Sequence, residues 1–278
     1  MESLKILETT VADRMAAWLA ETGIRRVYVY PGGTIAPLVN GFIRAGIAVE
    51  VFKHEQGAAY AALAQARLSG QPQVVMVTSG PGVTNVITPL ADAFYDSTPL
   101  LLITGQIGTP DLRSGRQVRQ RGFQEVPTVT LTQSLSKAAQ CVLSPAQALE
   151  AVVALHALST SGRPGPVVLD LPMDVQRAAC AIDVPMPVLT AATASEVPEA
   201  ACGEIASALA QAQRPVMLLG HGALRAAAFE TYLALADRAN ALVVTSLLGL
   251  GAYPSKHPRF LGYLGHTGHA VANQAVHE

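Results

Sequence analysis

Charged residues are scarce in this sequence of 278 residues: Asp, Glu, Lys and Arg make up 14% of it, and aromatic residues only 5%. Lysine and arginine number 19 against 20 acidic residues, so no basic excess is present to attract nucleic acid or an anionic membrane surface. Hydrophobic residues make up 50%, which is enough to bury one large core or two smaller ones. Two domains and small-molecule chemistry are therefore expected.

Cysteine is equally scarce. Cys141, Cys180 and Cys202 are far apart and odd in number, which gives neither a disulfide framework nor a Cys-x-x-Cys metal clip. No uninterrupted apolar stretch reaches membrane-spanning length, and the opening MESLKILETT lacks the basic and apolar regions of a signal peptide. These absences predict a soluble, cytoplasmic protein.

Short apolar runs alternate with helical patterns through residues 1–172. Apolar residues recur at helical spacing in segments such as 9–23, 55–68 and 145–160. Between such segments lie strand-like runs: RVYVY at 26–30, QVVMV at 73–77, PLLLIT at 99–104 and PVVLDLP at 166–172. Continuous apolar strands alternating with helices are typical of a parallel sheet covered on both faces. Residues 1–172 are thus predicted to form a doubly wound α/β domain.

A second α/β unit is predicted after a linker. Residues 173–197 include Pro185 and Pro187 and are interpreted as the linker. Residues 198–278 give further strand-like runs at 215–219 and 241–246 and close on a helical segment, HAVANQAVHE. A parallel sheet normally adds another strand after a helix, so this second domain is predicted to be incomplete.

Three turns of the first domain follow strands: PGGT at 31–34, the turn before Glu55, and SGPG at 79–82. Open α/β sheets bind ligands at the carboxyl ends of their strands, so these turns predict a ligand edge. The residues alone leave alternatives open. SGPG fits either a plain turn or a phosphate-binding loop. Glu55 fits either a helix-dipole partner or a functional acid, and His54 either a hydrogen-bonding histidine or a catalyst.

Several longer stretches resemble the N-terminal half of acetohydroxyacid (acetolactate) synthase-like enzymes, which use thiamine diphosphate. They are YPGGT, KHEQGAAY, TSGPGVTNVITPLADAFYDSTPLLLITGQ, GFQE and GRPGPVVLDLPMDVQ, followed by RPVMLLGHGAL, TSLLGLGAYP and YLGHTGHAVANQAV. The resemblance covers nearly the whole chain in the same order. It implies a pyrimidine-binding domain at 1–172 and part of the middle domain at 198–278.

The resemblance also implies roles for individual residues. Glu55 would hydrogen-bond the aminopyrimidine ring, so that the cofactor itself removes its thiazolium proton. The other implied residues lie near the cofactor or the reacting centre: Gly32, Gly33, Thr34, Pro81, Asn85 and Gln124, with Lys137 beside the active-site channel. Because the family holds the diphosphate elsewhere, this resemblance disfavours the phosphate-loop interpretation of SGPG.

Part of the family's machinery has no counterpart in the sequence. The family binds diphosphate and Mg²⁺ through a Gly-Asp-Gly stretch on a third domain, and no such stretch occurs here. A partner chain carrying that domain, in a hetero-oligomer with paired pyrimidine-binding domains, is therefore expected. Positions that match flavin contacts in the middle domain are Arg163, Gly220, Gly222, Thr245, Leu247 and Gly265. The family's GGG turn is GHG here and its LGMHG is LGHTG, which weakens the implied FAD site.

The expected function is that of the N-terminal subunit of a split enzyme. It would decarboxylate a 2-oxo acid of the pyruvate class and transfer the two-carbon unit to an acceptor. Two alternatives remain open at this point. One is a simple 2-oxo acid decarboxylase, and the other is a non-catalytic remnant or truncated fragment. In the helix after Glu55, the family's Glu-Gly-Tyr-Ala-Arg is Leu-Ala-Gln-Ala-Arg at 63–67, which bears on the substrate more than on the cofactor.

Overall fold

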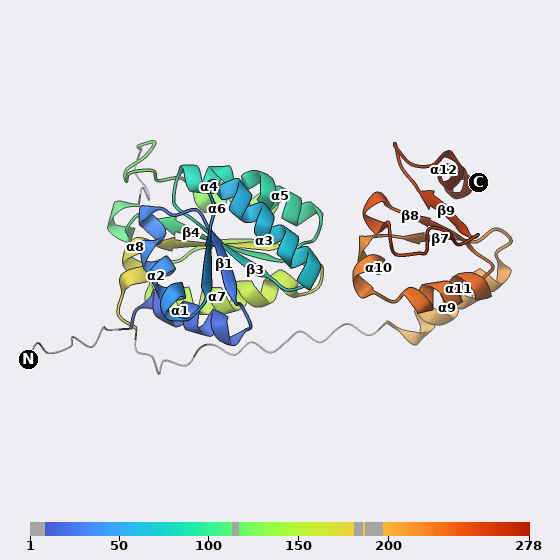
Figure 1. Ribbon diagram of the computed structural model, residues 1–278, viewed down its shortest axis with the longest axis horizontal. Helices are drawn as coiled ribbons and strands as arrows, with labels where there is room; N and C mark the ends of the chain where they lie inside the picture. Colours follow the sequence, from blue (N-terminus) through green and yellow to red (C-terminus); the bar gives the residue numbers. More distant parts are fainter. Residues whose placement is uncertain (1–8, 113–116, 181–185, 187–196) are drawn as a thin grey trace, which may run out of the picture. The chain divides into compact units, whose positions relative to one another are not determined.

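The computed structural model describes residues 9–112, 117–180, 186 and 197–278 (Figure 1). The chain divides into two compact units, residues 1–193 and 194–278. Among the described residues, no helix is both long enough and apolar enough to cross a membrane.

The first unit is built on a six-stranded sheet in which every pair of neighbouring strands is parallel. The strand order is β2-β1-β3-β4-β6-β5. The strands are β1 (Arg26–Val29), β2 (Ala48–Val51), β3 (Gln73–Val77), β4 (Leu100–Gln106), β5 (Ala138–Cys141) and β6 (Pro166–Pro172). The predicted parallel α/β sheet is confirmed.

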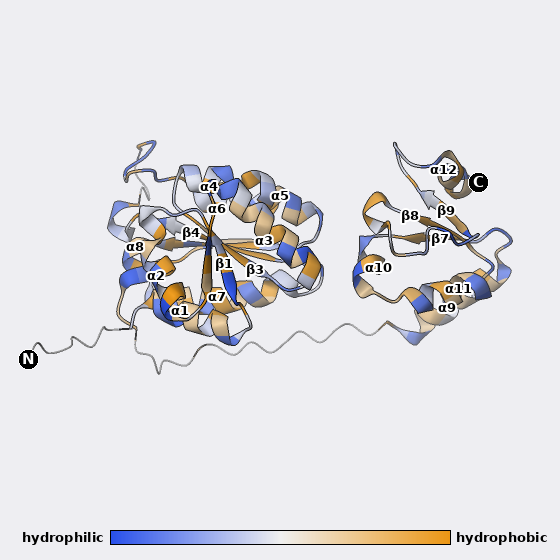
Figure 2. Ribbon diagram, viewed as in Figure 1, coloured by the Kyte–Doolittle hydropathy of each residue, from blue (hydrophilic) through white to orange (hydrophobic). Residues whose placement is uncertain are grey.

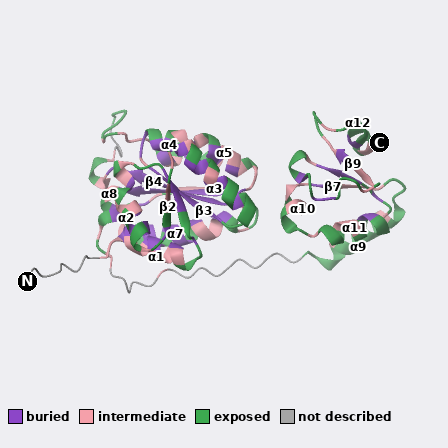
Figure 3. Cartoon of the chain, viewed as in Figure 1, coloured by how far each residue is buried: buried purple, intermediate pink, exposed green. Residues whose placement is uncertain are grey.

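Helices cover both faces of this sheet, because its central strands are apolar on both sides. Within β3, Val74 and Met76 belong to one core cluster, whereas Val75 and Val77 belong to the other. One face packs against α1 (Val11–Glu21), α2 (Ala36–Arg44), α7 (Pro145–Thr160) and α8 (Met173–Arg177). The opposite face packs against α3 (Glu55–Ser69) and α5 (Ile87–Tyr95). Figures 2 and 3 show the apolar, buried strands between these helical layers.

Short helices fill the connections at the carboxyl end of the sheet. They are η1 (Gly33–Ile35), α4 (Pro81–Asn85), η2 (Thr109–Asp111), α6 (Thr128–Thr132) and η3 (Gln133–Leu135). Segments 31–35 and 79–85 follow strands and continue directly into helix, as the sequence predicts.

The segment after β6 differs from the expected linker. Residues 173–177 form α8, which contributes Val175 to the core cluster shared with α1 and α2. An antiparallel bridge between Thr10 and Ala179 continues this attachment. Apart from Met186, the rest of the expected linker as far as residue 196 lies outside the described residues.

The second unit contains a three-stranded parallel sheet in the order β7-β8-β9. Its strands are β7 (Val216–Leu219), β8 (Leu242–Thr245) and β9 (Phe260–Tyr263). Its helices are α9 (Glu199–Gln211), α10 (His221–Ala226), α11 (Phe229–Arg238) and α12 (Ala270–His277), with η4 at Leu247–Gly249. The buried core here is small, comprising Leu219, Ala236, Val243, Ala252 and Tyr253. Helix α9 has no buried residue, as its exposed colouring in Figure 3 shows.

Candidate functional site

The carboxyl ends of β1, β3 and β4 lie side by side, because these strands are neighbours in a parallel sheet. The segments that follow these strands carry most of the residues implied by the family resemblance. These are Gly32, Gly33 and Thr34 after β1, Pro81 and Asn85 after β3, and Gln124 in the connection after β4. Glu55 follows β2, at the same edge.

Glu55 is the first residue of α3 and is buried, with only 4% of its surface exposed. Its preceding residue, His54, caps the helix: His54 Nδ1 accepts a hydrogen bond from the Gln56 backbone N–H at 3.1 Å. This helix-capping hydrogen bond is sufficient to explain a histidine at position 54. Asn85 Nδ2 donates a 2.9 Å hydrogen bond to Glu55 Oε2. The structure therefore brings together two residues that are 30 positions apart in the chain.

The carboxylate of Glu55 is only partly satisfied. Its second oxygen, Oε1, accepts no hydrogen bond from the part of the chain that the structure describes. A buried carboxylate normally collects several donors, because removing its charge from water is costly. Nearby, the Ser79 side chain is fully buried and its Oγ has no hydrogen-bond partner. This edge thus holds polar atoms that a bound group could satisfy.

Thr34 joins three segments of the edge. Its Oγ1 lies 2.8 Å from Thr78 Oγ1 and accepts a hydrogen bond from the Ser79 backbone N–H at 3.0 Å. Gln176 Nε2, on α8, donates to the Thr34 carbonyl at 2.7 Å. A Cβ on Gly105, in β4, would lie 2.4 Å from Thr34 Oγ1, so glycine is required there for the close approach. Thr34 therefore fixes the turn after β1 against β4 and the turn after β3.

Gly32 and Gly33 occupy contrasting environments. A Cβ on Gly32 would lie 2.4 Å from the Thr78 Cβ, a distance that real side chains do not reach. A Cβ on Gly33 would meet no atom within 4 Å. Gly32 is thus explained by packing, whereas Gly33 leaves open space at the ligand edge.

Gln124 lies against the turn after β3. Its backbone adopts φ +59°, a left-handed conformation that is uncommon for a residue with a side chain. Gly80 has φ +65°, and a Cβ on it would lie 2.7 Å from the Gln124 Cβ. Glu125 Oε2 accepts hydrogen bonds from the backbone N–H groups of Arg121 and Gly122 at 2.8 and 3.4 Å, which closes the turn. Of the arginines in this connection, Arg113 and Arg116 lie outside the described residues.

Lys137 and Arg163 do not join this edge. Both precede strands, β5 and β6, and so lie at the amino end of the parallel sheet. Lys137 Nζ donates to the carbonyls of Leu158 and Ser161 at 2.5 Å each, at the carboxyl end of α7. Burial lowers the pKa of Lys137. Arg163 Nε donates to Ser97 Oγ at 2.6 Å. Within this unit, neither side chain is near Glu55.

Three of the six implied flavin positions lie at the carboxyl ends of the strands of the second unit. Gly220 follows β7, Thr245 ends β8, and Gly265 follows β9. The Thr245 hydroxyl is buried without a hydrogen-bond partner. Asn273 fixes Gly265 through two bonds, since Oδ1 accepts from the Gly265 N–H at 2.8 Å and Nδ2 donates to its carbonyl at 3.0 Å. The two remaining positions in this unit lie in short helices: Gly222 in α10 and Leu247 in η4.

A buried acid that the sequence analysis passes over lies at the end of the first sheet. Asp170, in β6, is 2% exposed and accepts hydrogen bonds from Thr104 Oγ1 at 2.7 Å and from Gln106 Nε2 at 3.0 Å. Burial raises the pKa of Asp170 to about 6, against the lowering effect of these hydrogen bonds. The sequence signal was a single acid inside the apolar run PVVLDLP.

Comparisons with known proteins agree with this geometry. Residues 9–134 match the N-terminal TPP-binding domain of thiamine pyrophosphate enzymes, and residues 202–278 match the central domain of the same enzymes. The chain is 34% identical over 272 residues to a probable acetolactate synthase large subunit of Methanocaldococcus jannaschii, covering 96% of this chain and 45% of the relative.

Two further relatives give the same result. The acetolactate synthase large subunit of Lactococcus lactis is 34% identical over 284 residues, covering 100% of this chain and 48% of the relative. Acetolactate synthase 2, chloroplastic, of Zea mays is 37% identical over 270 residues, covering 95% and 41%. The chain therefore spans somewhat less than half the length of these curated relatives, and what it matches is their N-terminal part.

Proposed function

This chain carries the N-terminal and central domains of the thiamine pyrophosphate enzymes, and from that premise we propose that it supplies the pyrimidine-binding half of an acetolactate synthase-like active site. The buried Glu55–Asn85 pair carries the proposal. Glu55 lies at the carboxyl edge of the sheet, where open α/β domains bind their ligands, and one of its oxygens receives no donor from the described residues.

The residues at this edge fit the pyrimidine half of thiamine diphosphate. Glu55 would hold a ring nitrogen, and Asn85 would orient the carboxylate through its 2.9 Å hydrogen bond. Pro81 would line the ring pocket, together with Gly32 and Thr34. Gly33 would leave room for the reacting end of the cofactor, since no atom lies within 4 Å of the position of its missing Cβ. Gln124 would lie near the reacting centre.

When bound, the cofactor stabilises the carbanion left by loss of CO₂ from a 2-oxo acid. We assign Glu55, which is 4% exposed, the task of holding a proton at the ring nitrogen. The relatives are named acetolactate synthases, which supports a pyruvate-class substrate and transfer of the two-carbon unit to an acceptor.

A partner chain is the second part of the proposal. It would carry the remaining half of the relatives' length, including the diphosphate-binding domain and the ligands for Mg²⁺. An open sheet edge supports this: in the described part of the second unit, β7 pairs only with β8. Leu218, in β7, is 54% exposed, which is unusual for the first strand of a parallel sheet. In the doubly wound order 3-2-1-4, the fourth strand lies beside the first, so the partner's next strand would pair with β7.

FAD is a further proposed ligand of the second unit. Gly220, Thr245 and Gly265 collect at the carboxyl ends of its three strands, and the unpartnered Thr245 hydroxyl would accept or donate one hydrogen bond to the flavin cofactor. The sixth matching position, Arg163, belongs to the first unit.

The test begins with the proteins that co-purify with the untagged chain from its source cells, recorded by native mass spectrometry with thiamine diphosphate and Mg²⁺ present. A stoichiometric second protein, with cofactor mass retained, is the expected result. The Glu55→Gln substitution in that assembly should nearly abolish acetolactate formation from pyruvate, whereas the control Glu50→Gln, at a surface ion pair with Arg26, should not.

Other outcomes identify the alternatives. Acetaldehyde as the sole product from pyruvate would indicate a simple decarboxylase. Self-assembled copies that bind neither a partner nor the cofactor would indicate a non-catalytic fragment. Full activity of the Glu55→Gln assembly would contradict the role given to Glu55.

A further inference from the structure

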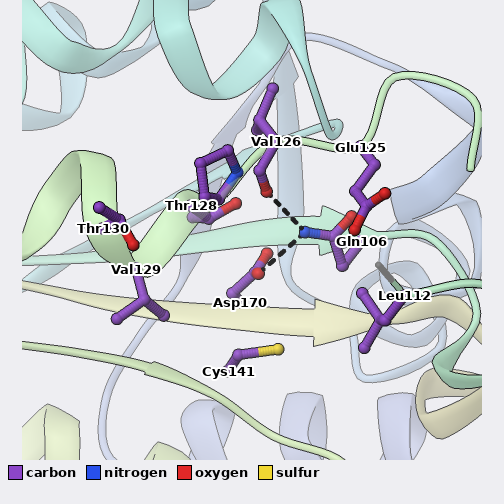
Figure 4. Close-up of a pocket in the computed structure, with 10 residues that line it drawn as sticks. Gln106, Leu112, Glu125, Val126, Thr128, Val129, Thr130, Cys141 and Asp170 are labelled. Carbon is purple, nitrogen blue, oxygen red and sulfur yellow. Dashed lines mark hydrogen bonds between the residues drawn. The ribbon is translucent and has the colours of Figure 1, made fainter. Parts of the chain in front are cut away.

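A second pocket lies behind the connection that carries Gln124. It has a volume of about 300 Å³ and is formed by β4, β5, β6, α6 and the segment preceding α6. Figure 4 shows its lining: Gln106, Leu112, Glu125, Val126, Pro127, Thr128, Val129, Thr130, Cys141 and Asp170. This volume lies at the lower end of the range for small-molecule sites.

Both charged side chains that the described residues contribute to this lining are acidic, Asp170 and Glu125. The Arg121 guanidinium donates to the carbonyls of Pro110 and Leu112. A ligand here therefore meets negative charge and hydrogen-bond acceptors.

The donors around Asp170 are fixed by the protein. Gln106 Nε2 bridges Asp170 Oδ2 at 3.0 Å and the Val126 carbonyl at 3.3 Å, as Figure 4 shows. Gln106 Oε1 is occupied by the Ile107 N–H at 3.0 Å. A carboxylate has about four acceptor positions, and the hydrogen bonds from Thr104 and Gln106 use two of them. These bonds also orient its oxygens rigidly.

Thr128 supplies an independent indication of a ligand. It is only 1% exposed and lines the pocket, and its hydroxyl makes no hydrogen bond of normal geometry among the described residues, although it lies close enough to Asp170 to help lower the pKa of that carboxyl. A buried hydroxyl without a well-placed partner is unfavourable unless another molecule satisfies it. Leu112, Val126 and Val129 complete the lining with apolar side chains.

We propose that this pocket binds a small organic cation, a primary alkylammonium ion whose nitrogen donates to Asp170 and Thr128 and whose short aliphatic body packs against Val126 and Val129. The inference does not rest on the proposed cofactor chemistry, because none of these four residues belongs to the candidate thiamine site. An ammonium group matches the site because it has three donors and no acceptor. Apolar walls favour an aliphatic body over a bare metal ion.

The experiment is a titration of the full chain with isobutylammonium chloride, followed by backbone amide NMR shifts. Isobutanol is the neutral control of similar shape, and sodium chloride controls for ionic strength. We expect saturable shifts of the amides of Val126, Thr128 and Val129 with a dissociation constant on the order of 1 mM, a usual affinity for a ligand of this size. Isobutanol should bind at least tenfold more weakly, since charge-assisted hydrogen bonds are the stronger ones.

Two variants locate the site. Asp170→Asn should weaken binding at least tenfold, whereas Asp174→Asn, which removes an exposed charge four positions later, should leave it unchanged. Thr128→Val should weaken binding severalfold and serves as the second variant if Asp170→Asn does not fold. Equal affinities for isobutanol and isobutylammonium, equal binding by wild type and the folded pocket variant, or no saturable shift would overturn the proposal.

The pH dependence supplies a test without mutation. The groups that face Asp170 are Cys141 from β5, Thr104 and Gln106 from β4, and Thr128 and Glu125 from the segment through α6. Burial and the adjacent Asp170 raise the pKa of the Cys141 thiol to about 12, so this thiol stays neutral. Because the pKa of Asp170 is raised to about 6, affinity for the cation should fall as the pH is lowered through this value. Affinity that does not change with pH would contradict Asp170 as the binding group.

Discussion

At the candidate site, the position of Gly32 is closely packed whereas that of Gly33 is open, so alanine substitutions at these two glycines test packing and function separately. In the Gly32→Ala variant, the new Cβ would lie 2.4, 2.7 and 2.9 Å from the Thr78 Cβ, Oγ1 and Cγ2. Thr78 cannot easily rotate away, because its Oγ1 is held 2.8 Å from Thr34 Oγ1. Overpacking of this kind costs about 1–3 kcal/mol. In the Gly33→Ala variant, the new Cβ meets nothing within 4 Å.

The expected effects on stability therefore have opposite signs. Gly32→Ala should lower the melting temperature by about 4–8 °C for a loss of about 2 kcal/mol in a domain of this size. Gly33→Ala should be neutral or stabilising by up to about 1 kcal/mol, since alanine restricts the unfolded chain. Gly33 has no left-handed φ that would exclude alanine.

Tryptophan fluorescence measures these effects in the first unit alone. The sequence contains a single tryptophan, Trp18 in α1, which packs against the first unit's core and contacts His156 edge to face at 5.4 Å. Thermal and urea unfolding followed by this signal should place Gly32→Ala below wild type and Gly33→Ala at or above it. If both variants lose the same stability, the contrast between packed and open glycines is incorrect. If Gly33→Ala retains full activity in the complete enzyme, the open space at Gly33 serves no ligand.

Three further predictions concern buried groups. The pKa of Asp170 is raised from 3.8 to about 6 in the folded state, so the folded state binds this proton more tightly than the unfolded chain does. The resulting contribution of about 3 kcal/mol to the unfolding free energy is present at low pH and is lost as the pH rises through about 6. The Asp170→Asn substitution should abolish this part of the pH dependence of the unfolding free energy. Cys141 is half-buried and its thiol pKa is raised to about 12, so it should react with a thiol reagent at pH 8 much more slowly than the exposed Cys202 in the folded protein; equally rapid modification of both would contradict the raised pKa of Cys141. Thr34→Val removes an acceptor from the Ser79 N–H and should destabilise the first unit by about 1–3 kcal/mol in urea unfolding, so an unchanged midpoint would contradict its joining role.

The strands that sequence alone located were the ones with continuous apolar runs. The runs at 73–77 and 166–172 coincide with β3 and β6, because both are buried throughout. The sequence analysis omitted β5 (AAQC) and β9 (FLGY). Strand β5 is at the edge of the sheet and only half-buried, so it needs no apolar run. Strand β9 contains Gly262 at φ +102° and an irregular register with β8, which weakens any strand pattern.

The candidate site was predictable where it depends on short motifs and unpredictable where it depends on long-range contacts. Turns after strands predicted that Gly33 and Glu55 lie at one edge, since parallel strands end together, whereas Asn85 was indicated only by the family resemblance. No pattern indicates that Gln176 donates to the Thr34 carbonyl from 142 residues away. The α8 helix that carries Gln176 has only five residues, too few to display a helical period, and was assigned to the linker.

The two buried carboxylates of the described chain differ in how far the protein satisfies them. Asp170 accepts from both Thr104 and Gln106, and burial leaves it partly protonated near neutral pH. Glu55 has the amide of Asn85 alone. Only 14% of the residues are charged, and burying a charge costs several kcal/mol. An apolar residue in place of either acid would avoid that cost. An acid kept at a ligand edge with one donor is therefore explained by what binds there, and Glu55 is the residue on which the cofactor proposal depends.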